Sequence, residues 1–104
     1  VNIAAGTSTG VIVNSMAAAT FVTAKFLVQV KQGSAYHSTE LMLVHDGTDV
    51  YMTEYGTVYT SDIIGTFDAS ISGGSVNIIF TKTAAAVAAN AQAQIRTTRL
   101  AMVA

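Results

Sequence analysis

Residues 24–30 read Ala24-Lys25-Phe26-Leu27-Val28-Gln29-Val30, and this stretch decides the fold class of the chain. Every even position in it is apolar, whereas Lys25 and Gln29 lie between the apolar residues. This period of two is typical of a strand that packs one face of an antiparallel sheet against a core. We therefore expect a strand over residues 21–31 whose inner face carries Val22, Ala24, Phe26, Val28 and Val30.

Similar segments recur along the chain at spacings of roughly ten residues, as in β-sandwiches and barrels. The pattern predicts further strands over residues 11–13, 38–45, 49–60, 63–72, 76–82 and 94–103, with residues 14–20 as a loop. In segment 38–45 both faces are apolar, with Leu41 and Leu43 on one and Met42 and Val44 on the other. That predicts a central strand covered on both sides.

Glycine and aspartate mark the turns of a chain that contains no proline. Asp46-Gly47 and Gly73-Gly74 supply positive φ at little cost, so both pairs predict hairpin turns. Gly56 predicts a bulge within the strand over residues 49–60. The inner faces of the next two strands are predicted to carry Ile63, Phe67, Ala69 and Ile71, and then Val76, Ile78 and Phe80.

The resulting prediction is an all-β chain that forms an antiparallel β-sandwich of seven to eight strands, for which jelly-roll-like connections are one option. Residues 1–12 are predicted to be an N-terminal arm or edge segment, and residues 13–104 the sandwich domain. The alanine-rich segment 83–93 favours a loop over a weak helix, because it lacks helix caps and an amphipathic stripe.

Composition limits the function classes. Charged residues make up only 11% of the 104 residues, against roughly a quarter in ordinary soluble domains. Such a surface is typical of a protein that lies in contact with copies of itself or with a larger assembly. The five basic residues are scattered and the net charge is −1, which argues against nucleic-acid binding. No segment is long and apolar enough to predict a membrane span, and no cysteine is present.

Two groupings could carry chemistry. His45-Asp46, with His37 upstream, could hold a metal, but Asp46 is already explained by the turn. Glu40 and Glu54 could form the carboxylate pair of a small hydrolase, which would also need a histidine in a cleft or an aromatic-lined groove. For both groupings the preferred interpretation is structural, as turn residues or as strand residues that face solvent or form ion pairs. No catalytic residue, metal or cofactor is assigned.

Tyr51, Tyr55 and Tyr59 recur every four residues. On a strand without a bulge, this spacing places all three rings on one face. Such a row predicts either a contact between subunits or a platform for sugar rings, and the subunit contact is preferred because aromatics are enriched at interfaces.

Four stretches carry a family resemblance: residues 23–30, 40–47, 53–56 and 65–74, with Arg96-Thr97 closing the pattern. Together they resemble a β-domain of structural virion proteins, associated with tail fibre, baseplate or capsid, in T4-like cyanophages and related marine tailed phages. The alanine-rich segment 83–93 is longer than that pattern implies.

The resemblance implies a non-enzymatic structural subunit of a phage particle, located in the virion. Its partners would be copies of itself, as a homotrimer, and other virion proteins, with neither nucleic acid nor membrane as a partner. The alternative it leaves open is a carbohydrate-binding or receptor-binding module of a phage fibre that contacts a glycan on the host surface.

Overall fold

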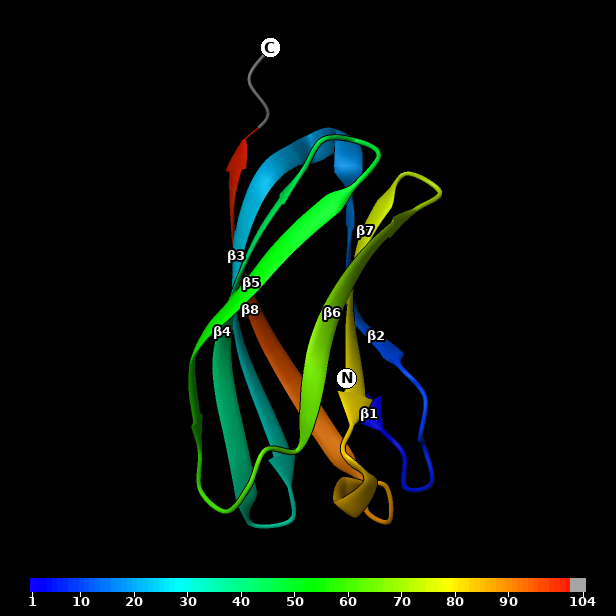
Figure 1. The fold of residues 1–104 in the computed structure, drawn as a ribbon, viewed down its shortest axis with the longest axis vertical. Coiled ribbons are helices and arrows are strands. Elements are labelled where there is room, and N and C mark those ends of the chain that lie inside the picture. The colour runs from blue at the N-terminus through cyan, green and yellow to red at the C-terminus, as the bar shows by residue number, and fades with distance from the viewer. Residues whose placement is uncertain (102–104) are drawn as a thin grey trace.

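The computed structural model describes residues 1–101, which form two antiparallel sheets packed face to face (Figure 1). Its strands are β1 (Asn2–Ile3), β2 (Val11–Ala17), β3 (Phe21–Gln32), β4 (Ala35–His45), β5 (Val50–Tyr59), β6 (Gly65–Ser72), β7 (Ser75–Lys82) and β8 (Ala91–Ala101). Two short 3₁₀ turns, η1 (Ala18–Thr20) and η2 (Ala84–Ala86), lie between strands. The predicted antiparallel β-sandwich is confirmed.

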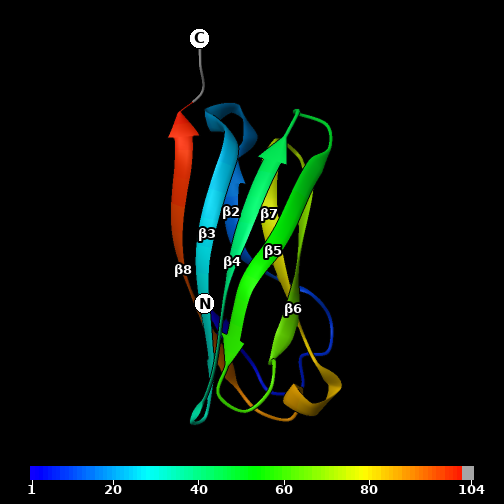
Figure 2. The same ribbon diagram turned by 60° about the vertical axis from the view of Figure 1, so that its left-hand side comes forward.

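Sheet order explains how distant segments come together. The five-stranded sheet has the order β1-β8-β3-β4-β5, and the three-stranded sheet has the order β2-β7-β6. Figure 2 shows β8, β3, β4 and β5 side by side in front of the smaller sheet. Because β8 returns to lie beside β3 after the β3-β4-β5 meander, the large sheet has Greek-key order, the arrangement from which jelly rolls are also built.

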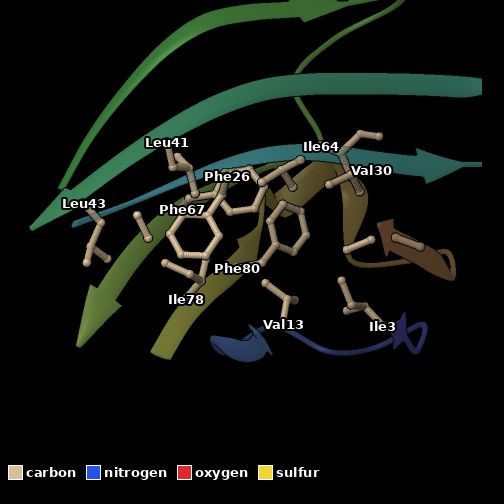
Figure 3. Close-up of a cluster of buried hydrophobic side chains, with 14 of the residues drawn as sticks. Ile3, Val13, Phe26, Val30, Leu41, Leu43, Ile64, Phe67, Ile78 and Phe80 are labelled. Carbon is tan, nitrogen blue, oxygen red and sulfur yellow. The ribbon is translucent and has the colours of Figure 1, made fainter. Parts of the chain in front are cut away.

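The core lies between the sheets. Phe26 of β3, Phe67 of β6 and Phe80 of β7 converge there (Figure 3), and the Phe67 and Phe80 ring centroids are 5.0 Å apart. Val76, Ile78 and Phe80 are all buried on the inner face of β7, as predicted. Gly65 is required beside them, because an added Cβ would lie 2.4 Å from the Phe80 ring.

The structure corrects three details of the strand prediction. Residues 14–17 belong to β2, not to a loop, because they pair with β7 beyond a register shift. A second shift, between Phe21 and Ala24 of β3, buries Phe21 and leaves Val22 exposed. Ile64, not Ile63, is the buried residue ahead of β6. The predicted Val103 lies outside the described residues.

The alanine-rich segment is a loop that contains η2, and β8 begins at Ala91, three residues before the predicted start. Two long side chains anchor it. The buried ammonium of Lys82 donates to the carbonyl oxygens of Ala4 (2.9 Å) and Ala89 (2.6 Å). Gln32 Nε2 donates to Ala86 O at 2.7 Å. These bonds satisfy loop carbonyls that alanine side chains cannot reach.

At the N-terminal end, β1 forms an edge of the five-stranded sheet beside β8, and Ile3 is buried in the core. Val11 and Ile12 already pair with β7, so β2 begins two residues before the predicted domain boundary.

Candidate functional site

The side of the five-stranded sheet that faces away from the smaller sheet, termed here the outer face, carries large apolar side chains. Along β4, Leu41 and Leu43 point into the core with exposed fractions of 0% and 1%. Between and beyond them, Met42 and Val44 are 44% and 43% exposed. The prediction that β4 is covered on both sides is therefore wrong for the single chain, because its outer side is open.

Register brings these side chains into one patch. Val44 lies opposite Tyr51 of β5, Glu40 lies opposite Tyr55, and Leu27 of β3 lies opposite Glu40 from the other side. Residues directly opposite on antiparallel strands share a face and lie within side-chain reach. We define the outer patch by its large apolar members, which are Leu27, Met42, Val44, Tyr51 and Tyr55.

The outer patch also has a shallow hollow. Thr23, Met42, Val44, Tyr51 and Thr53 line it. Its lining side chains are apolar or carry a single hydroxyl, and they include no Asp, Glu, His or Lys. The hollow is therefore suited to receive an apolar or aromatic group from outside the chain.

Charge within the outer patch is locally balanced. Lys25 Nζ lies 3.5 Å from Glu40 Oε2 and 5.8 Å from the centroid of the Tyr55 ring. Contact with the Tyr55 side chain and attraction to Glu40 raise the pKa of Lys25 above its ordinary value. The lysine therefore stays protonated at neutral pH, and the ion pair neutralises the centre of the patch.

Tyr59 does not belong to the same row as Tyr51 and Tyr55. Gly56 has a φ of 68°, and the β4–β5 register shifts between Ser38 and Glu40. The predicted bulge is therefore present, and it reverses the face of the residues that follow. Tyr59 lies opposite the buried His37, with ring centroids 6.5 Å apart, on the core side of the sheet at its exposed edge.

Both histidines are buried in structural positions. His45 Nδ1 accepts the Gly47 N–H at 3.0 Å, so its Nε2 carries the proton that bonds the Phe21 carbonyl. His37 Nδ1 accepts the Ile64 N–H at 3.2 Å, while its Nε2 has no partner in the described structure. Burial lowers the pKa of His37, and the charge of Glu54 opposes that shift only in part.

The candidate carboxylate pair is separated by the sheet. Glu40 lies opposite Tyr55 and Glu54 lies opposite Leu41, so the two acids occupy adjacent positions on opposite faces. Glu54 accepts a hydrogen bond from Thr57 Oγ1 at 3.3 Å. Within residues 1–101, no three His, Asp or Glu side chains are grouped closely enough to hold a metal ion. The geometry thus offers neither the hydrolase pair nor the histidine metal site considered from the sequence.

The four proposed turn residues lie at the ends of two hairpins. Asp46 Oδ1 accepts the N–H groups of Asp49 (2.7 Å) and Thr48 (2.9 Å), and these bonds lower the pKa of Asp46. Gly47 beside it has a φ of 90°. Gly73 and Gly74 have φ values of 57° and 78° and form the two-residue loop between β6 and β7.

Sequence patterns did not indicate the roles of Lys82 and Gln32, since their partners are backbone carbonyls. Ala4 is far from Lys82 in the chain and Ala86 is far from Gln32, whereas Ala89 is near Lys82. The exposure of the outer patch could not be predicted from the sequence either, because periodicity identifies apolar positions but not what covers them. No helix within residues 1–101 has the length or the apolar character needed to cross a membrane.

Comparison with protein-family models and with curated proteins found no match to this chain. The resemblance to structural virion proteins of tailed phages therefore stays a prediction.

Proposed function

We propose that this chain is a non-enzymatic structural subunit that works by binding neighbouring subunits through the outer patch. The observation that carries this proposal is the exposure of Met42 and Val44 on β4, an interior strand of the five-stranded sheet. An antiparallel sheet that faces water on one side normally presents polar residues there. Contiguous apolar patches on such faces mark interaction sites.

The size of the face supports a stable contact. The described chain measures 45 by 25 by 17 Å along its principal axes. The long side of the sandwich is therefore broad enough to hold an interface of roughly 800 Å² per partner, with the outer patch as its apolar part. Removing water from the Lys25–Glu40 pair at its centre costs free energy, although less than removing water from either charge alone.

In the virion setting that the resemblance implies, neighbouring copies and other particle proteins are the partners, and a homotrimer remains the expected stoichiometry. Low charge density suits such a permanently assembled role, because self-association no longer has to be prevented.

Light scattering of the native chain across protein concentrations tests the proposal. We expect a particle of at least two chain masses whose mass is retained on dilution into the micromolar range. A monomer at every concentration would contradict it.

A second candidate function, glycan binding, is favoured by one observation. Tyr51 is 58% exposed and lies on the same face as Tyr55. Flat aromatic surfaces of this kind can stack on sugar rings. A glycan titration followed by tyrosine fluorescence, with Tyr51→Ala as the control variant, separates the two functions. A saturable signal that Tyr51→Ala removes, in a monomeric chain, would favour glycan binding.

A further inference from the structure

The free edge of β5 is open to pairing over residues 50–55. The strand β6 is the edge of the three-stranded sheet that lies beside β5. There the Asp68 carboxylate accepts the N–H of Ala69 at 2.8 Å. The outer β2 is interrupted by a register shift, and the exposed part of β8 carries Arg96 and Arg99. Charges, bulges and side-chain capping are the devices that prevent edge strands from pairing. Between Val50 and Tyr55, β5 has one charged residue, Glu54, and no bulge.

Two hydrogen bonds show which backbone groups of β5 point outward. Asp46 N–H donates to Asp49 O at 3.1 Å at the closed end of the β4–β5 hairpin. The Tyr55 carbonyl accepts from Thr39 Oγ1 of β4 at 3.3 Å. Bonded and non-bonded pairs alternate along an antiparallel ladder. It follows that Thr53 and Tyr55 bond to β4, whereas the N–H and C=O groups of Met52 and Glu54 are directed away from it.

We propose that β5 pairs antiparallel with β5 of a second copy about a two-fold axis at Thr53, which joins two five-stranded sheets into one continuous sheet. This inference goes beyond the proposed function, because edge pairing is a second contact between copies that leaves Met42 and Val44 of the outer patch open. Together with a homotrimer formed through that patch, the pairing would give a closed particle of six copies. A two-fold axis requires the same edge on both copies, and closed two-fold pairs are the commonest oligomers.

The register follows from side chains. A pair centred on Thr53 places Tyr51 opposite the partner's Tyr55, so aromatic rings meet across the new strand pair on the outer face. The same register places Glu54 opposite the partner's Met52. A centre at Glu54 would place two carboxylates directly opposite each other, and a centre at Met52 would lose the tyrosine pairs. The Thr53 centre is therefore the favoured one.

A set of single-cysteine variants tests this register in a chain that has no cysteine of its own. At the two-fold axis, the Cα atoms of Thr53 and its symmetry mate form a non-bonded pair about 4.5 Å apart. That distance lies within the range that a disulfide spans. The Cα atoms of Tyr51 and of its own symmetry mate would lie roughly 14 Å apart, at 3.4 Å per residue, and Tyr55 is placed equivalently. A disulfide cannot bridge that distance.

The expected result is that Thr53→Cys oxidises to a covalent dimer at least tenfold faster than Tyr51→Cys or Tyr55→Cys at equal concentration. All three positions are exposed, so each variant is expected to keep the fold, which circular dichroism checks. Equal rates at the three positions would overturn the inference. So would the absence of a Thr53→Cys dimer while light scattering still shows an associated particle, a result that leaves the proposed function intact. A monomeric native chain would overturn both.

A backbone variant gives an independent result. Glu54→Pro removes an N–H that points away from β4, so the fold keeps its own ladder. Glu54→Ala is the matched control, because it removes the same side chain and keeps the N–H. Loss of association in the proline variant alone is expected, whereas equal association of both variants would contradict the pairing.

Discussion

The two outer faces of the sandwich are built from similar strands but differ in the side chains that they present. On the three-stranded sheet, β6 turns Thr66, Asp68, Ser70 and Ser72 outward, between the inward-facing Phe67, Ala69 and Ile71. On the five-stranded sheet, β3, β4 and β5 turn the aromatic and aliphatic members of the outer patch outward, whereas the three-stranded sheet exposes a single large apolar residue, Ile12 of β2, within the described part of the chain. Both faces are uncovered in the single chain, so burial within the fold does not explain the difference. The difference supports the proposal that another molecule covers the larger face.

Neighbouring residues of β4 provide the largest expected contrast. Leu41→Ala should cost about 2–5 kcal/mol of unfolding free energy, because it leaves a cavity in the core. Met42→Ala should cost under about 0.5 kcal/mol in the dissociated chain, because Met42 lies on the open outer face and outside the core. Urea unfolding at low protein concentration measures both. Similar losses for the two variants would show that the outer patch belongs to the fold.

The next contrast compares the two faces directly. Val44→Lys places a charge in the outer patch and should weaken association at least tenfold, about 1.4 kcal/mol. Ile12→Lys is the matched control, since Ile12 is a β-branched residue, 55% exposed, on the outer side of the three-stranded sheet. It should leave association unchanged. Light scattering measures the association of both variants. Equal weakening by the two substitutions would contradict the proposal that only the larger face is a contact surface.

A smaller effect is expected at the β6–β7 turn, away from the outer patch. Gly73→Ala forces a residue with a Cβ to adopt a φ of 57°, at a cost of roughly 1 kcal/mol in stability. An added Cβ meets nothing within 4 Å there, so the cost is conformational and not steric. The thermal midpoint should fall while the particle mass stays the same. A changed mass would mean that this turn takes part in assembly.

The smallest effect concerns pH and the inner side of the large sheet. Because burial lowers the pKa of His37, the unfolded chain binds a proton that the folded chain does not. This contribution to stability is complete above the ordinary histidine pKa of about 6.5 and declines as the pH falls below it. Urea midpoints at about pH 7.5 and 5.5 should differ less in His37→Gln than in the native chain. An unchanged difference would show that His37 is not the group that titrates.

Much of the fold could be predicted from alternation and turn chemistry. The positions of Phe26, Val28 and Phe80 follow from a period of two, and the loop at Gly73-Gly74 follows from the φ values that only glycine adopts easily. The prediction failed where an irregularity changed which residues of a strand face the core. One extra residue in β3 exchanged Val22 for Phe21, and the bulge at Gly56 moved Tyr59 to the other face. A bulge changes every later residue of a strand, and its position depends on contacts from other strands.

The candidate site was predictable only in part. Tyr51 and Tyr55 were recognised as one row, and the apolar character of both faces of β4 was recognised as well. The sequence could not show that Met42 and Val44 remain uncovered, because covering depends on which sheet packs against which face. The Lys82–Ala4 and Gln32–Ala86 contacts were also beyond sequence patterns, since each joins a side chain to a backbone oxygen more than fifty positions away.

Oxidation of Met42 tests most directly whether the outer patch is covered in the native particle. Methionine reacts with peroxide according to its exposure, and peptide mass spectrometry resolves the rate at this single residue. In the native chain, the Met42 rate should fall several-fold as protein concentration rises, whereas in Val44→Lys it should stay high at every concentration. A Met42 rate that is equally high in the native chain at all concentrations would contradict the proposal that the patch is a contact surface.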